Sequence, residues 1–424
     1  MNSMAPQLDS AITLPCGAAL RNRIMKSALS EGLADAFGAP DIRLTRLYSR
    51  WATIGGFGLL VTGNVMVDRQ HLGEPGNVVA DERSDLAAFA RWASAMRGTG
   101  TAMWMQINHP GRQANPIAGV RPVAPSAIPT GIPGMATPRE LSAREIADII
   151  QKFATAAVIA AESGFDGVQI HAAHGYLISQ FLSPNSNRRE DEWGGSSIEN
   201  RSRFLLEILR AIRRETAGRA GFAVGVKINS ADFQRGGFSE DDFRCVARLL
   251  ESDGIDMLEI SGGTYESPAM TGRAPELTAS TMAREAYFLE FAEAVRRETQ
   301  ASPIAVTGGF RTRAGMSDAI SSGACDIVGV GRPSATTPDA ATRILNGSAD
   351  LTTRAVTFGL PSTLARKQSI RALEGALELQ WHTDQLHRIA AGAEPDLRRS
   401  IVRTAGSAIQ RNGLGALQGR GRRR

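Results

Sequence analysis

Eight short apolar segments recur along the chain, and stretches with helical periodicity separate most of them. The segments span residues 24–29, 58–64, 101–108, 166–172, 223–229, 256–262, 302–309 and 325–331. Apolar runs without polar alternation are typical of parallel strands whose two faces are both buried. We therefore interpret the eight segments as strands of one parallel sheet.

The stretches between the segments carry helix start and stop signals. In 141–164, Ser142 can cap the first turn, Glu145 completes a capping box, and Gly164 ends the helix. Residues 196–218 and 239–254 repeat this design. Eight β-loop-α units favour a (β/α)₈ TIM barrel, and no GxGxxG follows the first strand to support an open sheet. The predicted fold class is therefore α/β, a TIM barrel.

Segments outside the repeats predict three additions to the barrel. "LPCGAAL" precedes the first strand and predicts an N-terminal hairpin that closes the bottom of the barrel. Residues 109–140 form a Pro/Gly-rich loop whose length suggests a functional role. We expect the barrel to occupy 1–350, followed by a helical C-terminal extension at 351–412 and a disordered basic tail at 413–424.

The extension could cover the barrel or form a homo-oligomer contact. Its helical pattern places Leu373, Leu377, Trp381 and Leu386 roughly on one face.

Composition narrows the classes of partner. The net charge is +5, but residues 397–424 hold eight arginines and no acid, and without them it is −3. The excess basic charge therefore belongs to the tail and says little about the main domain, for which we expect a small-molecule substrate and no nucleic acid as partners. The three scattered cysteines form no ligand or disulfide pattern, which suits a reducing cytoplasm. No leader pattern and no apolar run of membrane-spanning length is present, so we expect no membrane association.

Candidate chemistry gathers where the predicted strands end, which is where barrel enzymes place their active sites. The residues at these ends are Ser30, Gly63, Gln106, His171, Lys227, Gly308, Gly309, Gly331 and Arg332.

The last two strand ends are suited to a phosphate group. Glycines let backbone N–H groups approach an anion, and Arg332 adds a forked donor. A simpler explanation is that Gly308, Gly309 and Gly331 only permit tight turns. Lys227, one of four lysines, lies in an apolar strand, where its charge is costly unless it meets an anion or reaches solvent.

His171 and His174 lie three residues apart, with Tyr176 just behind them. They could bind a metal, pack as core histidines, or donate two N–H groups to one oxygen. The neighbouring strand ends offer Gln106 and Lys227 but no carboxylate or thiolate, so we expect no metal. Two imidazole donors would polarise a carbonyl as an oxyanion hole does, and Tyr176 could deliver a proton.

The combined motifs resemble those of a known family. They are "LRNRIMKSALSE", "YSRWATIGGFGLLVTGNV", "WMQINHPGRQ", "SGFDGVQIHAAHGYLISQFLSPNSNRREDEWGGSSIENRSRF", "VGVKIN", "VTGGF" and "VGVGRP", in this order within residues 10–345. The chain thus resembles the old yellow enzyme family of FMN-dependent ene-reductases, including the barrel domain of 2,4-dienoyl-CoA reductases.

The resemblance implies a role for each candidate residue. FMN would lie over the strand ends, with Gln106 on the flavin pyrimidine and Lys227 near N1 and the C2 carbonyl. Ser30 would lie near O4 and N5, and Gly63 would belong to the cofactor site. Gly308, Gly309, Gly331 and Arg332 would bind the phosphate. His171 and His174 would bind the substrate oxygen, and Tyr176 would protonate the α-carbon. NADPH or NADH would reduce the flavin in a ping-pong cycle.

Some features depart from the family pattern. Ser30 ends "SALS", where many members have proline, methionine and then threonine or cysteine, and Lys227 stands where many have arginine. The iron–sulfur cysteines and second flavin domain of the longer relatives are missing from the sequence, so we expect electrons directly from a nicotinamide or from an unknown donor. Two alternatives stay open. One is an FMN-dependent amine dehydrogenase or demethylase, which Trp104 and Tyr265 neither support nor exclude. The other is a non-catalytic flavin-binding barrel.

Overall fold

Eight parallel strands form a closed barrel in the computed structural model of the protein. The structure describes residues 5–115, 120–131, 134–232, 235–261, 291–299, 301–348, 350–351, 354, 356–358 and 368–414. The barrel strands are β3 (Ile24–Lys26), β4 (Leu59–Val61), β6 (Ala102–Asn108), β9 (Gly167–Ala172), β10 (Ala223–Asn229), β11 (Met257–Ser261), β12 (Ile304–Thr307) and β13 (Ile327–Val330). Pairing of β4 with β6 closes the ring. Each strand falls within its predicted segment, so the predicted TIM barrel is confirmed.

Three short strands outside the ring, β5 (Val65–Met66), β7 (Val123–Ala124) and β8 (Arg139–Glu140), were not predicted. β5 pairs with the end of β6, and β7 pairs with β8. The last pair lies within the long loop 109–140, so part of that loop has regular structure.

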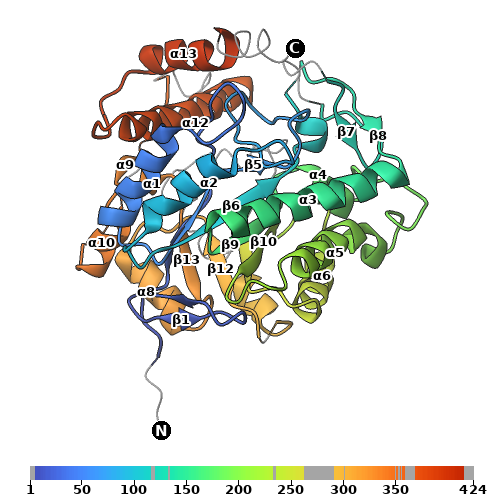
Figure 1. Cartoon of the computed structure of the whole chain (residues 1–424), viewed down its shortest axis with the longest axis horizontal. Coiled ribbons are helices and arrows are strands. Elements are labelled where there is room, and N and C mark those ends of the chain that lie inside the picture. Colours follow the sequence, from blue (N-terminus) through green and yellow to red (C-terminus); the bar gives the residue numbers. More distant parts are fainter. Residues whose placement is uncertain are drawn as a thin grey trace.

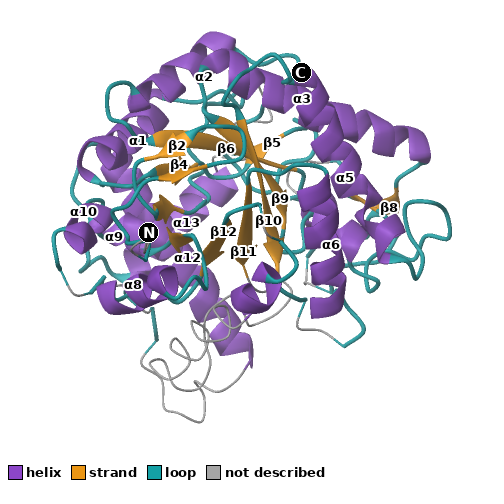
Figure 2. Cartoon of the chain, turned by 90° about the horizontal axis from the view of Figure 1, so that it is seen from below, coloured by secondary structure: helices purple, strands orange, loops and turns teal. Residues whose placement is uncertain are grey.

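Helices surround the barrel, as Figure 2 shows. They include α1 (Ile42–Ile54), α2 (Leu86–Ala93), α3 (Ala143–Ser163), α4 (Leu177–Leu182), α5 (Ile198–Glu215), α6 (Glu240–Ser252), α8 (Arg313–Ser321), α9 (Pro333–Thr336) and α10 (Ala340–Leu345). The predicted capping box of α3 is present, because Ser142 and Glu145 satisfy each other's backbone N–H groups. Gly164 ends that helix at φ 88°, a backbone conformation that favours glycine.

The lower part of the barrel interior is apolar. Trp104, Met25 and Met257 are among its fully buried side chains, and the hairpin of β1 (Ile12–Thr13) and β2 (Ala19–Leu20) packs beneath them. This hairpin confirms the prediction from "LPCGAAL". Because the hairpin and the apolar side chains fill one end of the barrel, polar chemistry is confined to the other end.

The C-terminal helices α12 (Gln368–Ala390) and α13 (Ile401–Ile409) lie at the end opposite the hairpin (Figure 1). α12 packs against α1 and α9. Trp381 and Leu386 are buried as predicted, whereas Leu373 is 51% exposed, so the predicted apolar face was wrong at that position. Residues 415–424 of the predicted tail lie outside the described residues. Among the described helices, none has the length and hydropathy of a membrane span.

Candidate active site

A cavity of about 510 Å³ lies at the carboxyl ends of the barrel strands, beneath α12. His171, His174 and Tyr176 line one part of it. The cavity is also lined by seven of the predicted cofactor residues, which are Ser30, Gln106, Lys227, Gly308, Gly309, Gly331 and Arg332. The structure thus brings together side chains and glycines from six different strand ends. Gln113 and Met135, from the described part of loop 109–140, also face the cavity.

The histidine pair and Tyr176 form a buried aromatic group. The His171 ring centroid lies 5.0 Å from that of His174 and 5.0 Å from that of Tyr176. Burial, then the neighbouring His174 and Lys227 charges, lower the pKa of His171 well below its usual value. Burial and Lys227 do the same to the pKa of His174. Both imidazoles are therefore neutral at pH 7, as an N–H donor pair requires.

Hydrogen bonds determine which nitrogen of each imidazole can act. The backbone N–H of Ala173 donates to Nδ1 of His171 over 3.3 Å, which leaves the proton of the neutral ring on Nε2. Nε2 of His174 lies 3.1 Å from the Ser261 hydroxyl. If Ser261 donates in that bond, the His174 proton is on Nδ1. Ser261 is thus a residue that the sequence reading did not assign.

The backbone at His174 has an unusual conformation. Its φ of 63° is the one positive value at a non-glycine position among the described residues. Its N–H donates to Asn229 Oδ1 over 3.3 Å, and its carbonyl accepts from Gln113 Nε2 over 3.2 Å. Strained backbone persists where neighbouring contacts determine it, and it is concentrated at functional sites.

Gln106 and Lys227, on the floor of the cavity, are joined by polar side chains that lie beneath it. Gln106 Nε2 donates to Gln169 Oε1 over 2.7 Å, and Gln169 Nε2 donates to Glu259 Oε2 over 2.7 Å. Glu259 Oε1 lies 3.0 Å from the Lys227 ammonium, and both side chains are at least 96% buried. Lys227 therefore does meet an anion, as the sequence suggested, but that anion belongs to the protein. Gln169 and Glu259 were not predicted, although Glu259 is the one charged residue within the apolar strand β11.

Gly63 does not line the main cavity. Its N–H donates to Glu31 Oε1 over 3.0 Å and lies 3.2 Å from the Tyr48 hydroxyl. Lys26 completes this buried group, with its ammonium 3.8 Å from Glu31 and 4.4 Å above the Trp51 ring. A side chain at position 63 would collide with Glu31, since an added Cβ would lie 1.9 Å from Oε2. The geometry gives Gly63 a packing role behind the site.

The far end of the cavity concentrates cationic groups. Gly308 and Gly309 have φ values of 147° and 83°, which only glycine adopts readily. Arg332 forms an ion pair with Glu378 of α12, and Arg311 lies nearby on the wall. His382, one helical turn after Glu378, also lines this end. Neither Glu378 nor His382 was assigned from the sequence.

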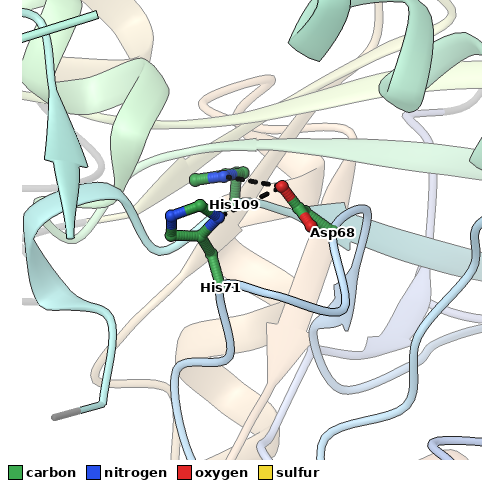
Figure 3. Close-up of side chains that lie close together, drawn as sticks. All are labelled: Asp68, His71 and His109. Atoms are coloured by element: carbon green, nitrogen blue, oxygen red, sulfur yellow. Dashed lines mark hydrogen bonds and ion pairs between the residues drawn. The ribbon is translucent and has the colours of Figure 1, made fainter. Parts of the chain in front are cut away.

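Asp68, His71 and His109 offer potential metal-ligand atoms within 4.8 Å of one another (Figure 3). Two contacts indicate a function other than metal binding. Lys152 donates to Asp68 Oδ2 over 2.7 Å and supplies the balancing charge. The N–H of Gly111 donates to His109 Nδ1 over 3.1 Å, which keeps a proton on Nε2, the atom nearest Asp68. We therefore interpret this group as an ion-pair cluster joining the loop after β5, the end of β6 and α3.

Comparison with known proteins identifies the family. A profile of the NADH:flavin oxidoreductase / NADH oxidase family matches residues 12–350. The chain belongs to this family. It is therefore a flavin-dependent NADH oxidoreductase related to old yellow enzyme, which confirms the resemblance seen in its motifs.

Individual members of the family show how far the similarity extends. The NADH-dependent flavin oxidoreductase iliE of Hypocrea jecorina is 42% identical over 349 residues, which cover 77% of this chain and 86% of that protein. The NADH oxidase of Thermoanaerobacter brockii is 37% identical over 74% of this chain, but the match spans only 47% of its length.

Solved structures agree with the family assignment. A 2-naphthoyl-CoA reductase complex superposes with a TM-score of 0.74 at 28% identity, over 80% of this chain and 52% of that one. Morphinone reductase superposes with a TM-score of 0.68 at 23% identity, which supports the fold.

Proposed function

We propose that the protein binds FMN and reduces an activated C=C bond, such as that of an α,β-unsaturated carbonyl compound, with NADH or NADPH as the reductant. The observation that supports this most is the convergence of His171, His174 and Tyr176 on one cavity whose floor holds Gln106 and Lys227. The two neutral imidazoles can donate hydrogen bonds to a substrate oxygen, and the phenol can donate a proton.

The residues present fit FMN. Gln106 has an amide that can pair with the flavin pyrimidine, and the ammonium of Lys227 lies on the same floor. At the other end, Gly308, Gly309 and Arg332 suit a phosphate. A further sign is the buried Nε2 atom of His382, for which the described part of the chain offers no hydrogen-bond partner. Gly63, the remaining predicted cofactor residue, does not line this cavity.

Each side chain on the wall has a defined task in this proposal. The Nε2–H of His171 and a proton on Nδ1 of His174 would bind the substrate oxygen and stabilise the negative charge that develops there. The Tyr176 hydroxyl would deliver a proton to the α-carbon. When bound, reduced FMN supplies the hydride to the β-carbon. Lys227, oriented by Glu259, would stabilise the negative charge of the reduced cofactor.

The names of several relatives agree with this reaction. An NADH:fumarate oxidoreductase of Klebsiella pneumoniae is 35% identical over 79% of this chain, and an NADH:acrylate oxidoreductase of Vibrio harveyi is 29% identical over 80%. The matches span only 35% and 33% of those two proteins, whose names describe the activity of the whole protein. Fumarate and acrylate each carry a C=C bond conjugated with a carboxyl group.

The amine dehydrogenase alternative has less support from the described residues. It would require an aromatic or acidic cage around a cationic substrate. Trp104 is buried in the apolar layer beneath the site and does not line the cavity, and Tyr265 lies outside the described residues.

The experiment is anaerobic. We expect the purified protein to show the absorption bands of oxidised flavin and to lose them when NADH or NADPH is added. Addition of an enone, a nitroalkene or an enoyl thioester should then restore the bands, and mass spectrometry should detect the saturated product. If amines bleached the flavin and none of the alkenes restored it, the proposed direction of reaction would be wrong.

A further inference from the structure

Helix α12 brings an imidazole to the cationic end of the cavity. The side chain of His382 is 4% exposed and lines the cavity with Gly309 and Arg332. Its Nδ1 lies 2.8 Å from the carbonyl oxygen of Glu378 and must donate in that bond. Its Nε2 is buried and has no hydrogen-bond partner among the described residues. A buried polar atom of this kind is costly unless a bound group satisfies it.

The charges around His382 come from three parts of the fold. Arg311 follows β12, Arg332 follows β13, and Glu378 lies on α12 itself. Burial, and then the two arginines, lower the pKa of His382 to about 4, although its bond to the Glu378 carbonyl opposes the shift. The ring is therefore neutral at pH 7 when no flavin is bound.

Glu378, which lies on α12 with His382, forms an ion pair with Arg332. One carboxylate oxygen pairs with the guanidinium, and the other accepts the backbone N–H of Val356 over 3.3 Å. A carboxylate next to a predicted phosphate ligand would repel a phosphate unless it moved away. Glu378 therefore acts as an internal competitor for that position.

We propose that α12 completes the phosphate site of the cofactor. His382 becomes an imidazolium that donates a hydrogen bond from Nε2 to the phosphate. The phosphate takes the place of the Glu378 carboxylate at Arg332. This inference rests on the proposed FMN function. With Nδ1 already donating to a carbonyl, a second donation from Nε2 requires the protonated ring. A phosphate dianion within contact distance favours that protonation. FMN should therefore bind together with a proton.

The family assignment does not supply this role. The family profile ends at residue 350, and His382 and Glu378 lie beyond it. The role of His382 is inferred instead from its position on the cavity wall, since α12 covers the strand ends on which Gly309 and Arg332 lie.

An alternative partner for Nε2 is a ribityl hydroxyl of the flavin, to which a neutral ring could be the acceptor. FMN and riboflavin share the ribityl chain and differ only in the phosphate. Comparing their affinities therefore separates the two possibilities, and lumiflavin, which lacks both groups, provides the baseline.

The test measures binding of FMN, riboflavin and lumiflavin to flavin-free protein by quenching of flavin fluorescence. We expect His382→Gln to weaken FMN binding about 10-fold or more, as loss of a charged hydrogen bond does, while riboflavin binding stays within twofold. Glu378→Gln should tighten FMN several-fold and leave riboflavin unchanged. His387→Gln is the matched control, because His387 lies on the same helix and bonds instead to the Glu31 carbonyl at 2.8 Å.

Calorimetry in buffers of different ionisation enthalpy tests the proton. FMN binding to the unaltered protein at pH 7 should take up more protons than binding to His382→Gln, a difference approaching one. Equal weakening of FMN and riboflavin by His382→Gln, or no difference in proton uptake, would overturn the phosphate role of His382. If no flavin bound even to the unaltered protein, the proposed function itself would fail, which is a distinguishable result.

Discussion

For a buried charged residue, the sequence can predict that a partner of opposite charge is needed, and the structure identifies that partner. Lys227 stood out because an apolar strand rarely carries an ammonium, and this predicted a nearby anion. The structure supplies Glu259 on the adjacent strand, in direct register. The sequence could not identify this partner, because the pairing of β10 with β11 depends on the closed barrel. Similarly, Ser261 could not be linked to His174 across 87 residues of chain.

Glu259 should control the charge beneath the cofactor. We expect Glu259→Gln to raise the midpoint potential of bound flavin by tens of millivolts, because an uncompensated Lys227 would favour the reduced anion. The same change should lower the free energy of unfolding by about 3 kcal/mol, as removing one partner of a buried pair does. Potentiometric titration and chemical denaturation measure the two effects.

A variant that removes both charges of the Lys227–Glu259 pair provides the control for that experiment. The double variant Lys227→Met/Glu259→Gln should return the unfolding free energy toward the original value, while the potential falls below that of Glu259→Gln. An unchanged potential in the single variant would show that Glu259 does not act on the cofactor.

Tyr176 should act in only one half of the catalytic cycle. We expect Tyr176→Phe to leave flavin reduction by NADH within about twofold, because no proton from the phenol is required there. Reoxidation by an enone should slow about 100-fold or more, the typical contribution of a positioned acid. Anaerobic stopped-flow absorbance resolves both steps.

A one-electron acceptor such as ferricyanide supplies the matched control for Tyr176→Phe. Reduction of ferricyanide requires no proton transfer to carbon. The rate at which ferricyanide reoxidises the flavin of Tyr176→Phe should therefore match the rate in the unaltered protein. A variant slowed equally with both acceptors would point to a disturbed cavity rather than a lost proton donor.

At the scale of elements, local signals were sufficient for most of the barrel. The cap residues Ser142 and Gly164 act on their own helix ends, so their effect can be predicted without tertiary information. The two-residue strands β7 and β8 were missed, because their pairing depends on two distant parts of one loop coming together. α12 was recognised as a helix, but which of its faces is buried depends on the cavity that it covers.

The capping box of α3 should give a defined pH dependence. Hydrogen bonds from Arg139, then from the Ser142 backbone, lower the pKa of Glu145 to about 2. Because the folded pKa lies below the unfolded one, the stabilisation is present above about pH 4.5 and is lost as pH falls toward 2. Glu145→Gln should therefore cost about 0.5 kcal/mol at pH 7, a small value for a half-exposed group, and progressively less below pH 4.5.

Urea unfolding monitored by circular dichroism from pH 7 to pH 3 measures this effect. Glu162→Gln, on the same helix and 3.9 Å from Arg219, is the control and should show a smaller loss at pH 7. A Glu145→Gln deficit that stayed constant with pH would show that the carboxylate charge is not its source.

For the whole molecule, the cavity lies where the barrel and its C-terminal extension meet, beside the packing of α12 against α1 and α9. The hairpin and apolar layer fill one end, while α12 covers the other. Sequence reasoning left open whether the extension covers the barrel or forms an oligomer contact, because a helix pattern does not say which surface it meets. In the structure, the extension contributes side chains to the cavity wall, so its stability should depend on what the cavity contains.

This dependence can be measured by hydrogen exchange across the chain. A ligand that contacts both parts favours the closed state by mass action and slows local opening of α12. We expect FMN to slow exchange in residues 373–390 substantially, and riboflavin at equal occupancy to slow it less, because only the phosphate reaches His382 and Arg332. α5, on the outside of the barrel, serves as the internal reference and should change little. Equal protection of α12 by the two flavins would mean that the helix responds to the ring system, and that the barrel and the extension are not joined through the phosphate.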